Sequence, residues 1–334
     1  MDRKGRTAMK VILVMGILSF VGLWSISALM KRALTPDEAQ LVKVTESHSP
    51  FDMGRAWADL GRVTAFGPRP AGSEGLERLR GYLRNELAAA GFTVREQAFD
   101  AETPAGMKRM VNLVAVSEGD RDGVIVLSNH YDTKHFADFD FVGANDGGST
   151  TAWMLEMART LGPARRGCTV WLVWLDGEEA WEKWGPGDSL YGSRAFVRHL
   201  RETGELAGIG ALVNLDMIGD AYLGIHRDPD APRWLLNAVW GTALRQGYGR
   251  HFLDAAKRVQ DDHLPFHDAG VPALELIDFS YGGSFAAHQR NWHTAADTLD
   301  KVRAESLKAV GDVLYHALPA IEAGMGRRDT ETAR

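Results

Sequence analysis

The chain has 334 residues, 45% of them hydrophobic and 25% charged, which are the proportions of an ordinary globular protein. Its net charge of −6 at pH 7 excludes the strongly basic surface that nucleic acids require, so we expect no nucleic-acid partner. The single cysteine, Cys168, excludes an internal disulfide. Because Cys168 begins an apolar run, we predict a buried and inert thiol.

The N-terminus carries a membrane signal. Residues 11–30 contain no charged side chain, and basic residues precede them within residues 1–10. That length and polarity predict a transmembrane signal anchor with a cytoplasmic basic segment and the rest of the chain outside the cytoplasm. A signal peptide cleaved near Ala28, which would release a secreted protein, stays an alternative.

Beyond the anchor the composition changes only once. A mixed polar stretch precedes a long region in which apolar runs alternate with amphipathic segments. We therefore predict a stalk, one catalytic domain and a polar tail, over residues 31–50, 51–325 and 326–334.

Helical and strand patterns alternate through the predicted domain. Leucines at helical spacing follow a candidate cap at Ser73, whereas continuous apolar runs are typical of buried strands. The expected helices are 52–64, 73–90 and 149–161, and the expected strands are 92–99, 108–116, 124–128, 169–175 and 211–215. This order predicts an α/β fold, a three-layer sandwich in which helices flank a mostly parallel mixed sheet.

Acidic and histidine side chains follow several of these strands. A lone histidine or a Glu-Glu pair is more often a core or surface feature, but polar groups beyond the carboxyl ends of parallel strands gather at one edge. Nitrogen and oxygen donors together suit zinc. The pattern therefore predicts a zinc site at this edge, drawn from His130, Asp146, Glu178, Glu179, Asp216 and His293.

Several motifs make the likeness to a known family specific. They are HYDTK at 130–134, FVGA at 141–144, DGEEA at 176–180, DSLYGSR at 188–194, LDMIG at 215–219, QDDHLPF at 260–266, GVP at 270–272 and WHT at 292–294. Together they resemble the zinc aminopeptidases of the co-catalytic metallopeptidase clan. Within that clan the sequence is most similar to the glutaminyl cyclases (glutaminyl-peptide cyclotransferases), over residues 51–318.

The resemblance implies a role for each site residue. One Zn²⁺ would be held by Asp146, Glu179 and His293, and Glu178 would be the general acid and base. The remaining residues would serve the substrate: Asp216 as the catalytic partner of its α-amine, Asp261 as a catalytic hydrogen-bonding carboxylate, Asp262 beside it, and His130, Trp184 and Trp292 as pocket residues. A helix-capping pair is the alternative for Asp261 and Asp262, and core packing is the alternative for the tryptophans, which we expect for Trp171 and Trp174 and leave open for Trp181.

Two other functions stay open. In a two-zinc aminopeptidase, His130 and Asp216 would hold a second metal and Asp146 would bridge the two ions, so the presence of these ligands does not fix the metal count. A non-catalytic ectodomain would be expected to have lost a ligand or Glu178, and none is lost. The expected partner is a peptide or protein N-terminus, bound by a monomeric enzyme.

The sequence departs from the family pattern at a few positions. Asn129 and Thr151 replace a cysteine pair of the animal enzymes, and Glu275 replaces a histidine after Gly-Val-Pro. The segment 278–291 before the WHT motif is longer than the family predicts. The way in which the substrate fits the pocket is therefore the property that the resemblance to the family predicts least directly.

Overall fold

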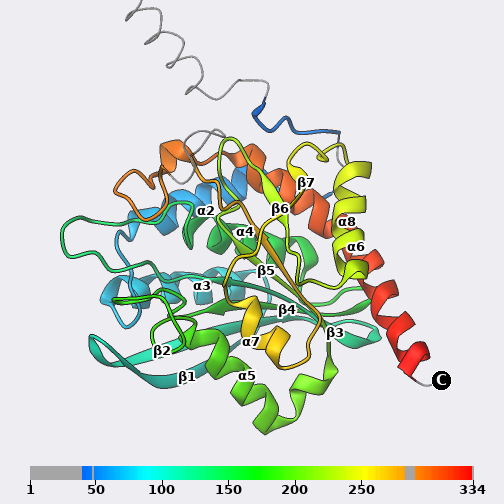
Figure 1. Cartoon of the computed structure of the whole chain (residues 1–334), viewed down its shortest axis with the longest axis horizontal. Coiled ribbons are helices and arrows are strands. Elements are labelled where there is room, and N and C mark those ends of the chain that lie inside the picture. The colour runs from blue at the N-terminus through cyan, green and yellow to red at the C-terminus, as the bar shows by residue number, and fades with distance from the viewer. Residues whose placement is uncertain (1–39, 47–48, 283–289, 333–334) are drawn as a thin grey trace, which may run out of the picture.

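A computed structural model describes residues 40–46, 49–282 and 290–332 of the chain, and Figure 1 shows their arrangement. The predicted cytoplasmic segment 1–10 and anchor 11–30 lie outside the described residues. Among the helices that are described, none combines the length and the apolar character needed to cross a bilayer.

A six-stranded mixed sheet forms the centre of the molecule. Its strands run in the order β1-β2-β4-β3-β5-β8, and a small second sheet pairs β6 with β7. The pairs β3–β4, β3–β5 and β5–β8 are parallel, and β1–β2 and β2–β4 are antiparallel. The bounds are β1 Val94–Thr103, β2 Gly106–Ser117, β3 Arg121–His130, β4 Cys168–Leu175, β5 Ile209–Asp216, β6 Ile225–Arg227, β7 Phe252–Ala256 and β8 Ala273–Ile277.

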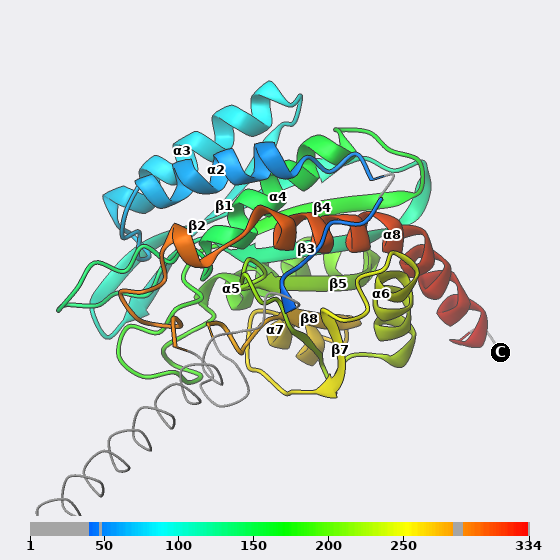
Figure 2. The ribbon, with the colours of Figure 1, turned by 90° about the horizontal axis from the view of Figure 1, so that it is seen from above.

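Helices cover both faces of this sheet, as Figure 2 shows. One face packs against α2 (Met53–Ala65), α3 (Glu74–Ala89), α4 (Gly148–Leu161) and α8 (Ala304–Thr332), with α6 (Arg233–Arg245) beside α8. The other face packs against α5 (Tyr191–Thr203) and α7 (His263–Asp268), and short 3₁₀ helices lie at Glu205–Gly208 and Leu299–Lys301. The predicted three-layer α/β sandwich is confirmed.

Local signals in the sequence explain where the first helices begin. The Asp52 carboxylate caps α2 by accepting from the backbone N–H groups of Gly54 and Arg55, and the Ser73 hydroxyl caps α3 by accepting from Leu76 N. Inside β4, Trp171 and Trp174 are buried in the core, as predicted. Cys168 is buried too, and burial raises the pKa of its thiol.

Part of the predicted stalk packs against the folded domain. Val42 is buried, and Thr45 donates from its hydroxyl to Gln246 O (2.9 Å) and from its backbone N–H to the Tyr248 hydroxyl (3.3 Å). At the other terminus α8 continues to Thr332, past the predicted start of the tail at residue 326. The domain boundaries drawn from composition stay predictions.

Candidate active site and metal centre

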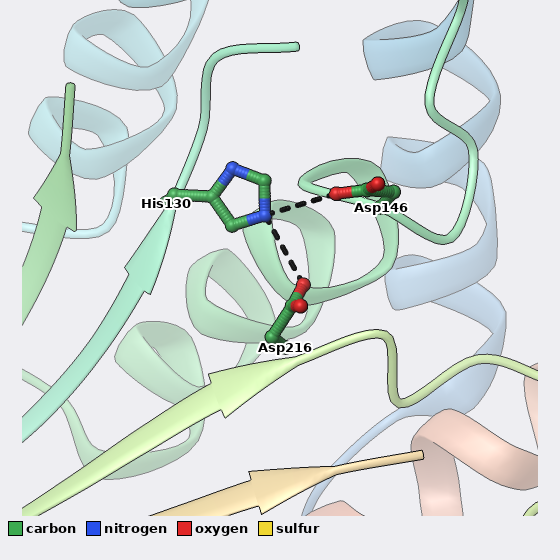
Figure 3. A group of neighbouring side chains, drawn as sticks. All are labelled: His130, Asp146 and Asp216. Atoms are coloured by element: carbon green, nitrogen blue, oxygen red, sulfur yellow. Dashed lines mark hydrogen bonds and ion pairs between the residues drawn. The ribbon is translucent and has the colours of Figure 1, made fainter. Parts of the chain in front are cut away.

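Three side chains converge beyond the carboxyl ends of the parallel strands. His130 ends β3, Asp216 ends β5, and Asp146 lies in the loop that leads into α4. The His130 Nε2 atom is 3.2 Å from Asp146 Oδ1 and 3.1 Å from Asp216 Oδ1, as Figure 3 shows. The predicted gathering of polar groups at one sheet edge is therefore what the fold produces.

A second group shares Asp146 with the first. His293 Nε2 lies 3.4 Å from Asp146 Oδ2 and 3.2 Å from Glu179 Oε1. In each group the possible ligand atoms all lie within 4.8 Å of one another. Asp146 directs one carboxylate oxygen toward each histidine, which is the arrangement of a bridging carboxylate.

The donors of the second group fit a zinc ion. Asp146 Oδ2 and Glu179 Oε2 are buried and have no hydrogen-bond partner among the described residues, although Lys134 Nζ lies 3.8 Å from Glu179 Oε2. A buried carboxylate oxygen without a donor is unfavourable, and a bound cation removes that cost. One imidazole nitrogen and two carboxylates are an ordinary zinc set that leaves a position open.

Glu178 belongs to neither group, although Glu179 follows it directly. Its side chain is buried, and its backbone N–H donates to Asp132 Oδ1 (3.2 Å). Burial, and then the adjacent Glu179 carboxylate, raise the pKa of Glu178 well above its ordinary value. A raised pKa makes a carboxyl group a stronger base once it is ionised, which suits a group that exchanges a proton with a substrate.

Asp132 fixes the loop that carries both glutamates. Its two carboxylate oxygens accept from the backbone N–H groups of Glu178 (3.2 Å) and Glu179 (3.4 Å). Asp132 Oδ1 also lies 3.6 Å from His130 Nδ1. The D of the HYD motif therefore lies between His130 and the loop of the two glutamates.

Asp297 accepts hydrogen bonds from the backbone of the loop that carries the candidate ligand Asp146. Its carboxylate accepts from Asn145 N (2.8 Å), Asp146 N (3.1 Å) and the Tyr281 hydroxyl (2.6 Å). Burial, and then the neighbouring Asp146, raise the pKa of Asp297 to about 7. No motif quoted above contains Asp297, and the sequence gave no indication of this contact.

Arg69 is a fully buried residue that sequence reasoning missed. Its guanidinium donates to the carbonyl oxygens of Tyr131 (3.2 Å), Val142 (2.5 Å) and Gly143 (2.9 Å). It thereby joins the segment after β3 to the loop that carries Asp146. Burial lowers the pKa of Arg69 to about 10.

His293 is held in an unusual backbone conformation. Its φ of 54° lies in the left-handed region, which non-glycine residues adopt only at an energetic cost. Residues in such conformations are found most often at functional sites. The Trp292 ring stacks on its imidazole at 4.0 Å between centroids, and the rings of Phe136 and Phe141 approach edge-on at 5.9 and 6.0 Å. Packing on several sides therefore fixes the ring of this candidate ligand.

The remaining predicted pocket residues lie around the same edge. Trp184 is half-buried and donates from Nε1 to Gln260 Oε1 (3.1 Å), which places its ring beside the segment that contains Asp261 and Asp262. Burial raises the pKa of Asp261 well above its ordinary value and that of Asp262 to about 7. Asp262 directly precedes α7, but its side chain makes no capping hydrogen bond to the helix, so capping does not explain it.

Two further residues that the sequence drew attention to are Trp181 and Asn129. Trp181 is half-buried, with Lys108 Nζ 4.6 Å from its ring centroid and the His135 ring at 5.4 Å. Asn129, in place of a family cysteine, donates from Nδ2 to Thr151 Oγ1 (3.1 Å) and Thr150 Oγ1 (3.3 Å). Hydrogen bonds thus join β3 to α4 at the position of the absent disulfide.

Comparisons with known proteins identify the family of this chain. The profile of Peptidase family M28 matches residues 112–318. The glutaminyl-peptide cyclotransferase of Gloydius blomhoffii is 31% identical over 289 residues, which cover 72% of this chain and 75% of that protein. The crystal structure of Acidobacteriales bacterium glutaminyl cyclase aligns with a TM-score of 0.77 and 38% identity, over 82% of this chain and 95% of that one. Porphyromonas gingivalis glutaminyl cyclase aligns with a TM-score of 0.73 and 28% identity, over 80% and 98% of the two chains.

The fold and the site together define an α/β enzyme of the zinc-exopeptidase type, in which acidic and histidine ligands lie beyond the carboxyl ends of parallel strands. The chain belongs to Peptidase family M28 and, within it, to the glutaminyl-peptide cyclotransferases.

Proposed function

We propose that this chain is a zinc-dependent glutaminyl-peptide cyclotransferase, an aminoacyltransferase that converts the N-terminal glutamine of a peptide or protein to pyroglutamate and releases ammonia. The observation that carries the proposal is the alignment with a solved glutaminyl cyclase at 38% identity over 95% of its length. The candidate zinc ligands Asp146, Glu179 and His293 and the separate buried Glu178 support it.

The residues of the site would share the work of the reaction. Asp146, Glu179 and His293 would hold the zinc ion, which when bound supplies a Lewis acid for the side-chain carbonyl of the substrate glutamine. The α-amine nitrogen forms a bond to that carbonyl carbon, and the bond from the carbon to the amide nitrogen breaks. Glu178 takes a proton from the attacking amine and returns it to the departing nitrogen, which leaves as ammonia.

The other predicted residues would place the glutamine for this attack. Asp216 would accept hydrogen bonds from the α-amine, and burial raises the pKa of its carboxyl. Trp184, Trp292 and His130 would line the pocket. Asp261 and Asp262 would support the pocket near Asp216 and Glu178 through hydrogen bonds. Because the attack is intramolecular, holding the substrate in its cyclising conformation supplies much of the rate enhancement.

A zinc aminopeptidase is the second candidate function. The group of His130, Asp146 and Asp216 favours it, because in that case these residues would hold a second metal. We propose one zinc ion, at Asp146, Glu179 and His293, for the cyclotransferase.

One assay tests the proposed function. The purified enzyme is incubated with a peptide that begins with glutamine, and loss of ammonia is followed by mass spectrometry, in parallel with hydrolysis of leucine and alanine anilides. Loss of ammonia without release of aniline supports the cyclotransferase. Release of aniline without loss of ammonia would establish the aminopeptidase instead.

For the placement of the enzyme we propose a membrane anchor at residues 11–30 and a catalytic domain outside the cytoplasm, acting as a monomer on peptide N-termini. The support is the uncharged span and the basic residues before it. Detection of a mature chain that begins after Ala28 would favour a secreted enzyme.

A further inference from the structure

A row of three polar side chains crosses neighbouring strands beside the active site. Ser128 on β3 is paired in register with Asn214 on β5, and Asn214 is paired with Glu275 on β8. All three are buried, with exposed fractions of 0%, 1% and 2%. The Ser128 hydroxyl donates to Asn214 Oδ1 (2.7 Å), and Asn214 Nδ2 donates to Glu275 Oε2 (2.9 Å).

This row interrupts an apolar face of the sheet. Two positions earlier on the same three strands are Val126, Leu212 and Ala273, which belong to the core beneath α5 and α7. Burying a hydroxyl, an amide and a carboxylate is unfavourable unless each finds a partner, and apolar side chains would fill such a row at lower cost. The three polar side chains of the row therefore each need a hydrogen-bond partner.

The row ends on a carboxylate of the active site. Asn214 Nδ2 donates to Asp261 Oδ1 (3.1 Å) as well as to Glu275, so its amide group joins the two acids. With Ser128 donating to its oxygen, every polar atom of the Asn214 side chain has a partner. The orientation of this amide is therefore fixed. The Asp262 backbone N–H donates to the same Asp261 Oδ1 atom (2.5 Å), so the amide and the start of α7 hold this oxygen together.

Glu275 is itself held from two sides. His263 Nδ1 lies 2.8 Å from Glu275 Oε2, and the Glu275 backbone N–H donates to Asp228 Oδ2 (3.3 Å). His263 begins α7, two residues after Asp261. Glu275 thus contacts both the sheet and the start of this helix.

We propose that Asn214, held by Ser128 and Glu275, is a positioning residue that sets the orientation of the Asp261 carboxylate in the active site. Asn214 acts on the reaction only through Asp261. The proposal rests on the proposed function, because that function assigns Asp261 to the site.

A double-mutant cycle tests this link. Asn214→Leu keeps a similar volume but removes the amide, and we expect kcat for cyclisation to fall by about ten-fold with KM and zinc content nearly unchanged. The same substitution is then made in an Asp261→Asn background, whose residual activity is followed at high enzyme concentration. There it should have almost no further effect, because the group through which it acts is already altered.

A milder variant and a matched control accompany the cycle. Ser128→Ala removes one hydroxyl and should lower kcat by a few-fold, again only when Asp261 is present. Thr242→Val is the control, because that buried hydroxyl donates only within α6, to Ala238 O (2.7 Å), and its loss should leave kcat unchanged.

The outcomes separate the two proposals. An equal fall in kcat in both backgrounds overturns the positioning role, because the effect would then be transmitted through strand β5 and Asp216. No fall in kcat for either variant overturns it too, because the row would then have no effect on the reaction. An unsubstituted enzyme that releases no ammonia from a glutamine peptide overturns the proposed function instead. If Asn214→Leu does not fold, the Ser128→Ala cycle decides the question alone.

Discussion

The adjacent glutamates Glu178 and Glu179 have different surroundings at this site. Glu179 Oε1 lies 3.2 Å from His293 Nε2 in the candidate metal group, whereas Glu178 belongs to neither group and has a raised pKa. The loop that carries both contains Gly177, whose φ of 70° lies in the left-handed region. In the proposed mechanism, this one loop would supply a zinc ligand and a proton carrier from consecutive positions.

Replacing Glu178 tests the proton carrier. Glu178→Gln keeps the shape of the side chain and removes no candidate ligand, so we expect kcat to fall by about 10²–10⁴-fold while zinc content stays constant. Steady-state kinetics and metal analysis of the same preparation measure both. Glu182→Gln, on the exposed part of the same loop, is the control and should stay fully active. Near-normal turnover of Glu178→Gln would remove this residue from the mechanism.

Asp216 is where the cyclotransferase and aminopeptidase proposals differ most. In a one-zinc cyclotransferase, Asp216→Ala should leave zinc content unchanged, raise KM and lower kcat, because the carboxylate positions the α-amine. In a two-zinc peptidase the same change should remove about one equivalent of zinc. His293→Ala is the reference variant, and it should lose the zinc ion in both cases. A fall from two ions to one in Asp216→Ala would contradict the one-zinc proposal.

At the scale of the elements, the strand ends were predictable and the contacts between strands were not. Continuous apolar runs followed by acidic or histidine residues located β3, β4 and β5 and the candidate ligands beyond them. The row of Ser128, Asn214 and Glu275 depends on strand order and register, which no single run contains. Arg69 was equally hidden, because its carbonyl partners lie more than sixty residues away and its own segment predicts only a turn.

The Arg69 contacts lead to a prediction about the loop before α4. Arg69→Ala leaves buried carbonyl oxygens of Tyr131, Val142 and Gly143 without a donor, so we expect the free energy of unfolding to fall by at least about 2 kcal/mol. Denaturant titration measures this change. Arg84→Ala, which removes a surface ion pair with Glu96, is the control and should change stability by no more than about 0.5 kcal/mol. Equal effects of the two substitutions would contradict the proposed role of Arg69.

For the whole molecule, the anchor and the catalytic domain should be separable. We expect the full chain to partition with membranes, because residues 11–30 are uncharged and follow a basic segment. A chain that starts at Thr35 should be soluble and equally active, since it retains every candidate site residue. Fractionation of cell extracts, followed by the cyclisation assay, measures both properties. Recovery of the full chain in the soluble fraction without cleavage would contradict the anchor.

The contacts of residues 40–46 set how far such a truncation can go. A chain that starts at Phe51 loses the buried Val42 side chain and the two hydrogen bonds of Thr45 to Gln246 and Tyr248. Burial of one valine and one or two net hydrogen bonds stabilise the fold by about 2–4 kcal/mol, so the melting temperature should fall by several degrees relative to the chain that starts at Thr35. Zinc content and kcat should stay the same, because none of these contacts reaches the site. Equal melting temperatures for the two chains would show that the segment is a stalk along its whole length, as its composition predicts.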